Sequence, residues 1–404
     1  MTLFADQNIN IGALRKKAFN YRWAEVPEGT IPLTAADPDY PAAPEISRAL
    51  IDYIRDGYFS YTPKLGYPEF AQALSTALAR RKGEEIPPRL ILPIDSAARG
   101  MYEIARAVLR PGDEMIVFDP ADYLFRESCL AAGGKPVYFP ARLKGGYIDL
   151  SALENYITPK TRMIGLCNPH NPYGVLYRGE DLEHIMGLCE KYDLYIMNDE
   201  IWSDIVYADP SGSSGPSGSS GPGGFLSVYS LGNERCRRVM SVFGFSKSFG
   251  IAGLRAGCVY CTDEERFAEI VKVSAVMTTA GGISSLSQVA GIACLNECYY
   301  WVDEFVRHLK GNRDYAAGRI NGIPGLSCHV PQATYLMYVD IRQLGLSSEG
   351  FAEHLKKNAG LAVVPGGRQY FGAASEGYVR ICFATSRELL TEGLDRLEAG
   401  VGLL

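Results

Sequence analysis

Lys247 is the only charged residue between Arg238 and Arg255, in the segment VFGFSKSFGIAGLRAG. An ammonium group is costly to bury in such an apolar turn, rich in Gly and Ser. Desolvation would lower its pKa and favour the neutral amine, which can form an imine with an aldehyde. Taken alone, however, Lys247 is better explained as a lysine with a buried stem and an amine that reaches solvent.

Two other apolar runs are followed by polar residues that change this balance. Asp199 lies just beyond the run LYIM, and Asn168, His170 and Asn171 follow the run MIGLC. Separately, Asp199 could be a helix cap and NPHNP a plain turn. Together with Lys247 they match what pyridoxal 5'-phosphate requires, namely an acid for the pyridine nitrogen, a donor for the phenolic oxygen and a lysine for the aldehyde.

Five short apolar runs are the elements that must position these side chains. They are nearly continuous rather than alternating, which is typical of strands buried on both faces. Helical patterns such as the one over 179–192 lie between them. This repetition predicts a parallel sheet covered by helices, with the ligand site beyond the carboxyl ends of the strands. The runs are 115–118, 163–167, 194–197, 239–245 and 257–261.

The sequence predicts an α/β protein in which a large domain, with a mostly parallel sheet between helices, is joined to a smaller α+β domain. We expect residues 1–44 to be a turn-rich segment that joins the small domain, and 45–295 to form the large cofactor-binding domain. Residues 296–404 would supply a linking helix and the small C-terminal domain. Within the large domain, SGSSGPSGSSGPGG at 211–224 predicts a flexible exposed loop, either natural or an engineered linker.

Length and charge limit the classes of function. The chain has 404 residues and a formal net charge of −6, with no basic block that would indicate nucleic-acid binding. No apolar run reaches the roughly 18 residues of a membrane span, and the first ten residues do not resemble a signal peptide, so we expect a cytoplasmic protein. The ten cysteines are scattered, mostly in apolar segments. We therefore expect buried thiols, and no metal site at Cys258 and Cys261.

Over nearly its whole length, from about residue 28, the chain resembles fold-type I pyridoxal-phosphate enzymes of the aminotransferase class I/II superfamily. The spacing of eight residues from Lys247 to Arg255 is the most specific single feature of this resemblance. It implies the fold of these enzymes and pyridoxal 5'-phosphate as the cofactor. The motifs that carry it are NPHNPYG at 168–174, NDEIW at 198–202 and SKSFGIAGLRAG at 246–257.

The resemblance implies a role for each matching residue. Lys247 would form the Schiff base with the cofactor and shuttle a proton, Asp199 would pair with the pyridine nitrogen, and Asn171 would bind the phenolic oxygen and the substrate. Arg380, in YVRIC, would hold the substrate α-carboxylate through its bidentate fork. The phosphate would lie at a helix N-terminus. Further residues around the cofactor would be Ser96, Ala97, Ala98, Ser246, Arg255, Trp202, Tyr123 and, from the neighbouring subunit, Tyr61.

Several positions depart from the pattern of the superfamily. Asp122 stands where an aromatic residue usually stacks on the ring, so either Tyr123 takes this place or the ring face is polar. Trp202 stands where aminotransferases often have a tyrosine and the lyases a histidine, and its indole N–H could donate to the phenolic oxygen or merely pack. Gly244 replaces a common phosphate-binding serine, and the turn DSAAR lacks the usual glycine.

Two reactions remain open. The first is that of an aminotransferase acting on an α-amino acid, favoured by the segment from Lys247 to Arg255 and by the strand that holds Arg380. The second is that of a C–S β-lyase of the cystathionine type, or of a related elimination or cyclisation enzyme. It is favoured by residues 35–63 and 331–342, which resemble the MalY/PatB branch of the superfamily.

A third function, that of a cofactor-binding regulator, is disfavoured because such proteins carry a DNA-binding domain, for which there is no room before residue 28. The expected partners are an amino-acid substrate and a second copy of the chain. The homodimer is implied by Tyr61, which would serve the cofactor of the neighbouring subunit.

Overall fold

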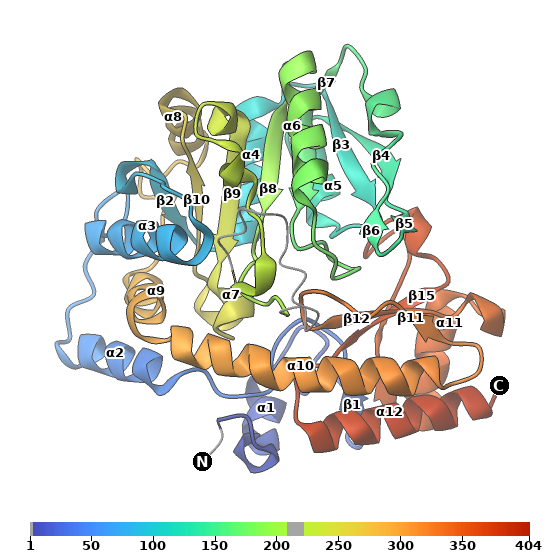
Figure 1. Cartoon of the computed structure of the whole chain (residues 1–404). Helices are drawn as coiled ribbons and strands as arrows, with labels where there is room; N and C mark the ends of the chain where they lie inside the picture. Colours follow the sequence, from blue (N-terminus) through green and yellow to red (C-terminus); the bar gives the residue numbers. More distant parts are fainter. Residues whose placement is uncertain (1–2, 208–221) are drawn as a thin grey trace.

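The computed structural model describes residues 3–207 and 222–404. Its main element is a seven-stranded sheet (Figure 1). In sheet order the strands are β2 (Ile91–Ile94), β10 (Gly257–Cys261), β9 (Val239–Gly244), β8 (Tyr195–Asp199), β7 (Thr161–Cys167), β3 (Glu114–Asp119) and β4 (Lys135–Pro140). The strands from β9 to β4 are parallel, whereas β10 is antiparallel to both β9 and β2. The predicted α/β fold with a mostly parallel sheet is therefore confirmed.

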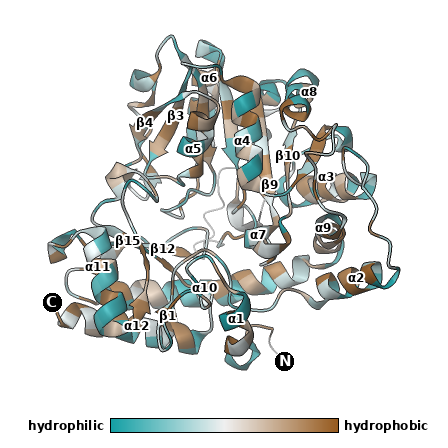
Figure 2. Ribbon diagram, turned by 180° about the vertical axis from the view of Figure 1, so that it is seen from behind, coloured by the Kyte–Doolittle hydropathy of each residue, from teal (hydrophilic) through white to brown (hydrophobic). Residues whose placement is uncertain are grey.

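Helices cover both faces of this sheet. Helix α6 (Gly179–Tyr192), which matches the helical pattern expected over the same residues, lies in front of the sheet in Figure 1. Helices α4 (Ala97–Val108) and α5 (Leu124–Ala131) lie on the opposite face, in front in Figure 2. Because both faces are covered, every residue of β9 and β10 is buried, which explains their continuous apolar sequences.

A smaller antiparallel sheet comes from the C-terminal part of the chain. Its strands, in order, are β11 (Ser327–Cys328), β12 (Leu336–Asp340), β15 (Tyr378–Cys382) and β14 (Val364–Pro365). Helix α10 (Tyr299–Asn321) runs beneath both sheets in Figure 1, and α12 (Arg387–Gly402) packs against it. Helix α11 (Ser348–His354) covers β14 and β15.

The N-terminal segment is tied to this C-terminal unit. Strand β1 (Ile31–Pro32) pairs in parallel with β13 (Leu361–Ala362). The guanidinium of Arg22 and the carboxylate of Asp39, both fully buried, form an ion pair of 2.5 Å, and Arg22 also donates to the carbonyl of Pro32. The backbone N–H of Cys382, the last residue of β15, also donates to the carbonyl of Leu33 at 3.1 Å, which holds this turn-rich segment against the smaller sheet.

The other elements connect these units. None of the described helices is long and apolar enough to cross a membrane. The loop expected at 211–224 lies outside the described residues except for its last three. The remaining helices and strands are α1 (Ile11–Lys17), α2 (Pro44–Arg55), α3 (Pro68–Lys82), α7 (Phe245–Ser248), α8 (Glu264–Val273), α9 (Ser285–Glu297), β5 (Leu143–Lys144) and β6 (Tyr147–Ile148).

Candidate active site

The carboxyl ends of β7, β8 and β9 meet at one edge of the large sheet. Asp199, the last residue of β8, is paired with Cys167, the last residue of β7. Asn171 follows β7 by four residues, and Lys247 lies in α7, directly after β9. Because these three strands are parallel neighbours, the polar residues that follow them lie at the same edge. The acid, the amide and the lysine singled out in the sequence thus follow neighbouring strand ends.

Lys247 points its amine at the N-terminal segment of the chain. Its Nζ donates to the carbonyl oxygen of Ala36 at 2.7 Å and lies 5.5 Å from the centre of the Trp202 ring. Burial lowers the pKa of Lys247, and the carboxylate of Asp37 opposes this shift. Trp202 is itself buried and packs edge-on against Tyr335. The lysine is therefore desolvated, as a nucleophilic amine requires.

Asp199 is a buried carboxyl group, only 7% exposed. Its Oδ1 accepts a hydrogen bond from the backbone N–H of Ile201 at 3.0 Å, but no ion pair among the described residues includes it. Burial raises the pKa of Asp199 to about 7, although the positive charge of Lys247 acts in the opposite direction. A cation placed against this carboxylate would offset the cost of burying its charge.

We expect this buried charge to make the stability of the apoprotein depend on pH. An unfolded aspartate ionises near pH 4, whereas Asp199 in the folded chain holds its proton until about pH 7. The folded state therefore loses stability as the pH rises from about 4 to 7, by up to about 4 kcal/mol. The variant Asp199→Asn should be more stable than the unchanged apoprotein at pH 8, but not near pH 4, in urea unfolding.

Asp204 offers a matched control for this experiment. It is equally buried, but its carboxylate pairs with Arg81 at 3.3 Å and accepts from the Ser248 hydroxyl at 2.8 Å. Asp204→Asn should therefore destabilise the apoprotein. If Asp199→Asn lowers stability at pH 8 as Asp204→Asn does, the Asp199 carboxylate has a stabilising partner, and this prediction is wrong.

Arg380 reaches the site from β15 of the smaller sheet. Its Nη1 lies 3.3 Å from Oδ1 of Asn171, whose Nδ2 donates to Asp122 at 3.0 Å. The guanidinium lies 4.8 Å from the centre of the Phe371 ring, and its buried Nε has no hydrogen-bond partner among the described residues. Burial lowers the pKa of Arg380. A buried guanidinium with an unused donor suits a carboxylate ligand.

A third group of predicted residues gathers where β2, β10 and β9 meet. The first residue of β10 pairs with the last residues of β9 and β2. Arg255 precedes β10 by two residues, while Ser246 and Ser96 follow β9 and β2 by two, so continuing the register brings them together. Ala97 and Ala98 begin α4, where backbone N–H groups have no intrahelical acceptor. The exposed Arg255 side chain forms no ion pair or hydrogen bond with the described residues, which suits a phosphate ligand.

Other residues singled out in the sequence differ from these in their exposure and their contacts. Tyr61 is 90% exposed, between α2 and α3, and Tyr123 is half exposed beside Asp122. His170 is fully buried, stacks on Tyr173 at 5.5 Å, and has no hydrogen-bond partner for either ring nitrogen among the described residues. Burial lowers the pKa of His170 to about 3. His170 is therefore a core side chain and not a proton carrier.

The residues present fit pyridoxal 5'-phosphate. The desolvated amine of Lys247 suits its aldehyde, and the Asp199 carboxylate lacks the cation that a protonated pyridine nitrogen would supply. Arg255 and the free N–H groups of α4 suit its phosphate. The described residues contain no cluster of three or more His, Cys, Asp or Glu side chains that could hold a metal ion.

Two features of the site have no local signal in the sequence. One is the contact of Lys247 with the carbonyl of Ala36, across 211 positions. The other lies behind Asp199, where Glu200 pairs with Lys82 at 2.6 Å and Lys82 also pairs with Glu84. All three side chains are buried. The burial of Glu84 raises its pKa to about 8. One proton can therefore remain on the pair formed by Glu84 and Glu200 near neutral pH.

Comparisons with known proteins agree with this geometry. The family model described as "Aminotransferase class I and II" matches residues 28–397. The aspartate aminotransferase of Pyrococcus horikoshii is 30% identical over 374 residues, covering 92% of this chain and 90% of that protein.

Two solved structures extend the similarity to three dimensions. The aromatic aminotransferase from Pyrococcus horikoshii OT3 has a TM-score of 0.84 at 29% identity, covering 93% of this chain and 97% of that one. A "putative PLP-dependent beta-cystathionase" from Corynebacterium diphtheriae has a TM-score of 0.86 at 26% identity, covering 100% of this chain and 99% of that one.

Proposed function

Because this chain belongs to the aminotransferase class I and II family and is a pyridoxal 5'-phosphate-dependent aminotransferase, we propose that its site transfers the amino group of an α-amino acid to an oxo acid. One observation carries the proposal. Lys247, Asp199 and Asn171 follow three adjacent strand ends, and Arg380 reaches Asn171 from the smaller sheet. An amine, an unpaired acid and a carboxylate-binding guanidinium are the groups that this chemistry needs.

Each of these side chains has a separate role in the proposed reaction. When bound, the cofactor supplies an aldehyde for the amino group and a ring that withdraws electrons from the reacting carbon. Lys247 Nζ takes the proton from the substrate Cα and returns it, for which its lowered pKa suits it. Asp199 holds the proton on the ring nitrogen, because its ionised carboxylate gains a cationic partner there. Arg380 binds the α-carboxylate and so orients Cα toward Lys247.

The remaining assignments concern the cofactor's surroundings. Ser96, Ala97, Ala98, Ser246 and Arg255 hold the phosphate, supported by the strand register that brings them together. Asn171 would donate to the phenolic oxygen through the second N–H of its amide, since the first is bonded to Asp122. Trp202 and Tyr123 would lie beside the cofactor ring.

We also propose the division of the chain into a segment at 1–44, a large domain at 45–295 and a linking helix with a small domain at 296–404. Two observations support it. The large sheet lies within 45–295, and the smaller sheet within 296–404. The pairing of β1 with β13 supports the assignment of the N-terminal segment to the small domain.

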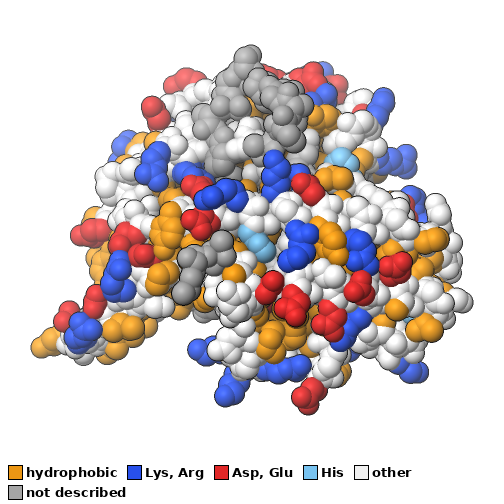
Figure 3. Space-filling model, turned by 60° about the horizontal axis from the view of Figure 1, so that its bottom comes forward, with side chains coloured by type: hydrophobic (Ala, Val, Ile, Leu, Met, Phe, Trp, Pro, Cys, Tyr) orange, Lys and Arg blue, Asp and Glu red, His pale blue; other side chains and the backbone are white. Residues whose placement is uncertain are grey.

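A homodimer is supported by apolar side chains exposed around the chain between α2 and α3. Figure 3 shows apolar atoms on the projecting part of the molecule at the left, where Figure 1 places this segment. Tyr61 lies among these side chains and would reach the cofactor of the neighbouring subunit. The exposed residues are Ile51, Ile54, Tyr58, Phe59, Tyr61 and Leu65. A second copy of the chain would remove this area from water.

A cytoplasmic location is supported by the cysteines. All ten are free thiols, and nine are buried, which is the usual state in a reducing compartment.

A C–S β-lyase is the second candidate, and the similarity to the "putative PLP-dependent beta-cystathionase" supports it. The two reactions share the removal of the Cα proton by Lys247. They differ in the next step, because the lyase expels a thiolate from the β-carbon, whereas the aminotransferase needs an oxo-acid acceptor.

Product analysis separates the two reactions. We expect glutamate to form from 2-oxoglutarate when the enzyme is given a suitable α-amino acid. Cystathionine without an oxo acid should give less than about 1% of that rate, since a 10²-fold preference needs only about 3 kcal/mol of difference. Pyruvate and thiol formed rapidly from cystathionine, with no glutamate in the first assay, would assign the lyase instead.

A further inference from the structure

A cavity of about 370 Å³ lies between the smaller sheet and the segments that follow β4 and β7 of the large sheet. Its lining includes none of the residues assigned above to the cofactor or the substrate. Arg142 comes from the side of the large sheet, just before β5, and Tyr173 from the loop after β7. Tyr338 of β12 and Tyr378 of β15 come from the smaller sheet. The volume is within the range of small-molecule pockets.

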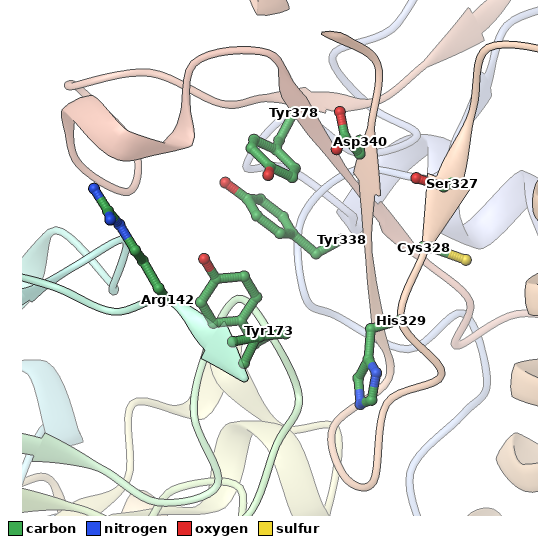
Figure 4. A pocket seen from close by; sticks show the side chains of 9 residues that line it. Arg142, Tyr173, Ser327, Cys328, His329, Tyr338, Asp340 and Tyr378 are labelled. Carbon is green, nitrogen blue, oxygen red and sulfur yellow. The ribbon is translucent and has the colours of Figure 1, made fainter. Parts of the chain in front are cut away.

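Three tyrosine rings form the wall of this cavity (Figure 4). The rings of Tyr338 and Tyr378 stack in parallel, with centroids 4.7 Å apart and an interplanar angle of 3°. The ring of Tyr173 meets Tyr338 edge-on at 5.4 Å. Figure 4 shows the three phenol oxygens on the side that faces Arg142. The cavity therefore combines an aromatic wall with hydroxyl groups directed to one side.

The hydroxyl of Tyr338 is a buried polar group that can bind a ligand. Tyr338 is 6% exposed, and its buried oxygen has no hydrogen-bond partner within 3.5 Å among the described residues. Burial raises the pKa of Tyr338 well above its ordinary value, and nearby Ser375 lowers it only in part. Burial likewise raises the pKa of Tyr173. These phenols therefore keep their protons near neutral pH and can act as donors.

The charges around the cavity leave one cation uncompensated. The exposed Arg142 guanidinium makes no ion pair or side-chain hydrogen bond in the described part of the chain. Asp340, by contrast, pairs with Arg342 at 2.5 Å. Asp119, which acts on Tyr173 and Tyr338, accepts from the backbone N–H of Ala374 at 3.0 Å. Both acids have partners, so the unused groups are donors and a positive charge.

We propose that this cavity binds a small aromatic carboxylate, with its ring against the tyrosine wall and its carboxylate held by the Tyr338 hydroxyl and Arg142. Aromatic rings pack favourably against each other, and a carboxylate accepts from both a phenol and a guanidinium. The ligand would bridge two parts of the molecule, because Arg142 lies in the loop between β4 and β5 whereas Tyr338 lies on β12 of the smaller sheet. Tyr338 pairs in register with Arg380, so this site adjoins the proposed α-carboxylate contact, but its lining contains none of the residues assigned to the reaction above.

Benzoate is a suitable probe, used with the cofactor-loaded enzyme and measured by isothermal titration calorimetry. Because benzoate can also bind Arg380, the first titration uses the variant Arg380→Gln. We expect one binding event there. Tyr338→Phe should weaken it about fivefold, as the loss of one hydrogen bond does. Arg142→Gln should weaken it about tenfold or more. Acetate, without a ring, and benzamide, without a charge, should each bind at least about tenfold more weakly.

Matched substitutions elsewhere control for general effects. Tyr138→Phe on β4 and Arg89→Gln, whose guanidinium pairs with Glu264 on the surface, should leave benzoate binding unchanged. In the chain that keeps Arg380, Tyr338→Phe should weaken only one of two binding events, which tests the proposal even if Arg380→Gln fails to fold. Absence of binding in a folded Arg380→Gln variant, or binding that neither Tyr338→Phe nor Arg142→Gln weakens, would overturn the proposal.

Discussion

Replacing Lys247 by alanine should lower turnover by at least about 10³-fold, because one change removes both the nucleophile and the group that moves the Cα proton. The covalent bond to the cofactor should be lost as well. Borohydride treatment followed by mass spectrometry should find a reduced phosphopyridoxyl group (the cofactor, less water, plus two hydrogens) on Lys247 of the unchanged enzyme, and on no residue of Lys247→Ala. The visible absorbance that shifts with substrate should also disappear.

Lys272→Ala is a suitable control for this experiment. Lys272 lies on α8 with its side chain 74% exposed and pairs only weakly with Glu269, at 3.5 Å. Its replacement should leave turnover and labelling unchanged. If Lys247→Ala keeps its colour and more than about a tenth of its turnover, the chemistry does not use this amine.

Asp199→Ala and Arg255→Ala should separate the chemistry from the retention of the cofactor. Without Asp199 no carboxylate keeps the ring nitrogen protonated, so we expect turnover to fall by about 10² to 10³-fold. Arg255 is assigned to the phosphate, away from the reacting carbon, so its loss should weaken cofactor binding by about tenfold or more while a saturated enzyme still turns over. Equilibrium titration of the apoprotein with cofactor, followed by kinetics at saturating cofactor, measures both quantities.

Arg237→Ala provides a comparison for Arg255→Ala. Arg237 pairs with Asp263 at 2.9 Å on the surface and belongs to no predicted site. Arg237→Ala should change neither turnover nor cofactor affinity, since surface ion pairs contribute little to stability. Equal losses of turnover and cofactor affinity in Asp199→Ala and Arg255→Ala would mean that the two residues do not have separate roles.

The sequence predicted the part of the site that follows from local pattern. Buried parallel strands have continuous apolar sequences, and their carboxyl ends meet at one edge, so the residues that follow them can be expected to lie together. This reasoning placed Asp199, Asn171 and Lys247 at neighbouring strand ends, where the structure has them. It also identified helix 179–192 with its observed bounds.

Other contacts could not be predicted because they join distant parts of the chain. Arg380 reaches Asn171 across 209 positions, and only the packing of the two sheets places it there. The pattern NPHNP marked His170 as polar, but burial among Phe118 and Tyr173 makes it part of the core. The hydroxyl of Tyr338 gives no signal in the sequence either, because a buried phenol without a partner looks like any strand tyrosine.

The contact between Arg380 and Asn171 has a consequence for selectivity. At 3.3 Å it is a long hydrogen bond, and it joins the guanidinium that we propose binds the α-carboxylate to the strand ends of the large sheet. A carboxylate bound by Arg380 would contact the smaller sheet while the rest of the substrate lies at the strand ends of the large sheet. A simple amine has no carboxylate for Arg380 to bind, so it would contact only the half of the site at the strand ends of the large sheet. In this proposal, discrimination between amino acids and amines would depend on how the two halves of the molecule fit together, and not on either half alone.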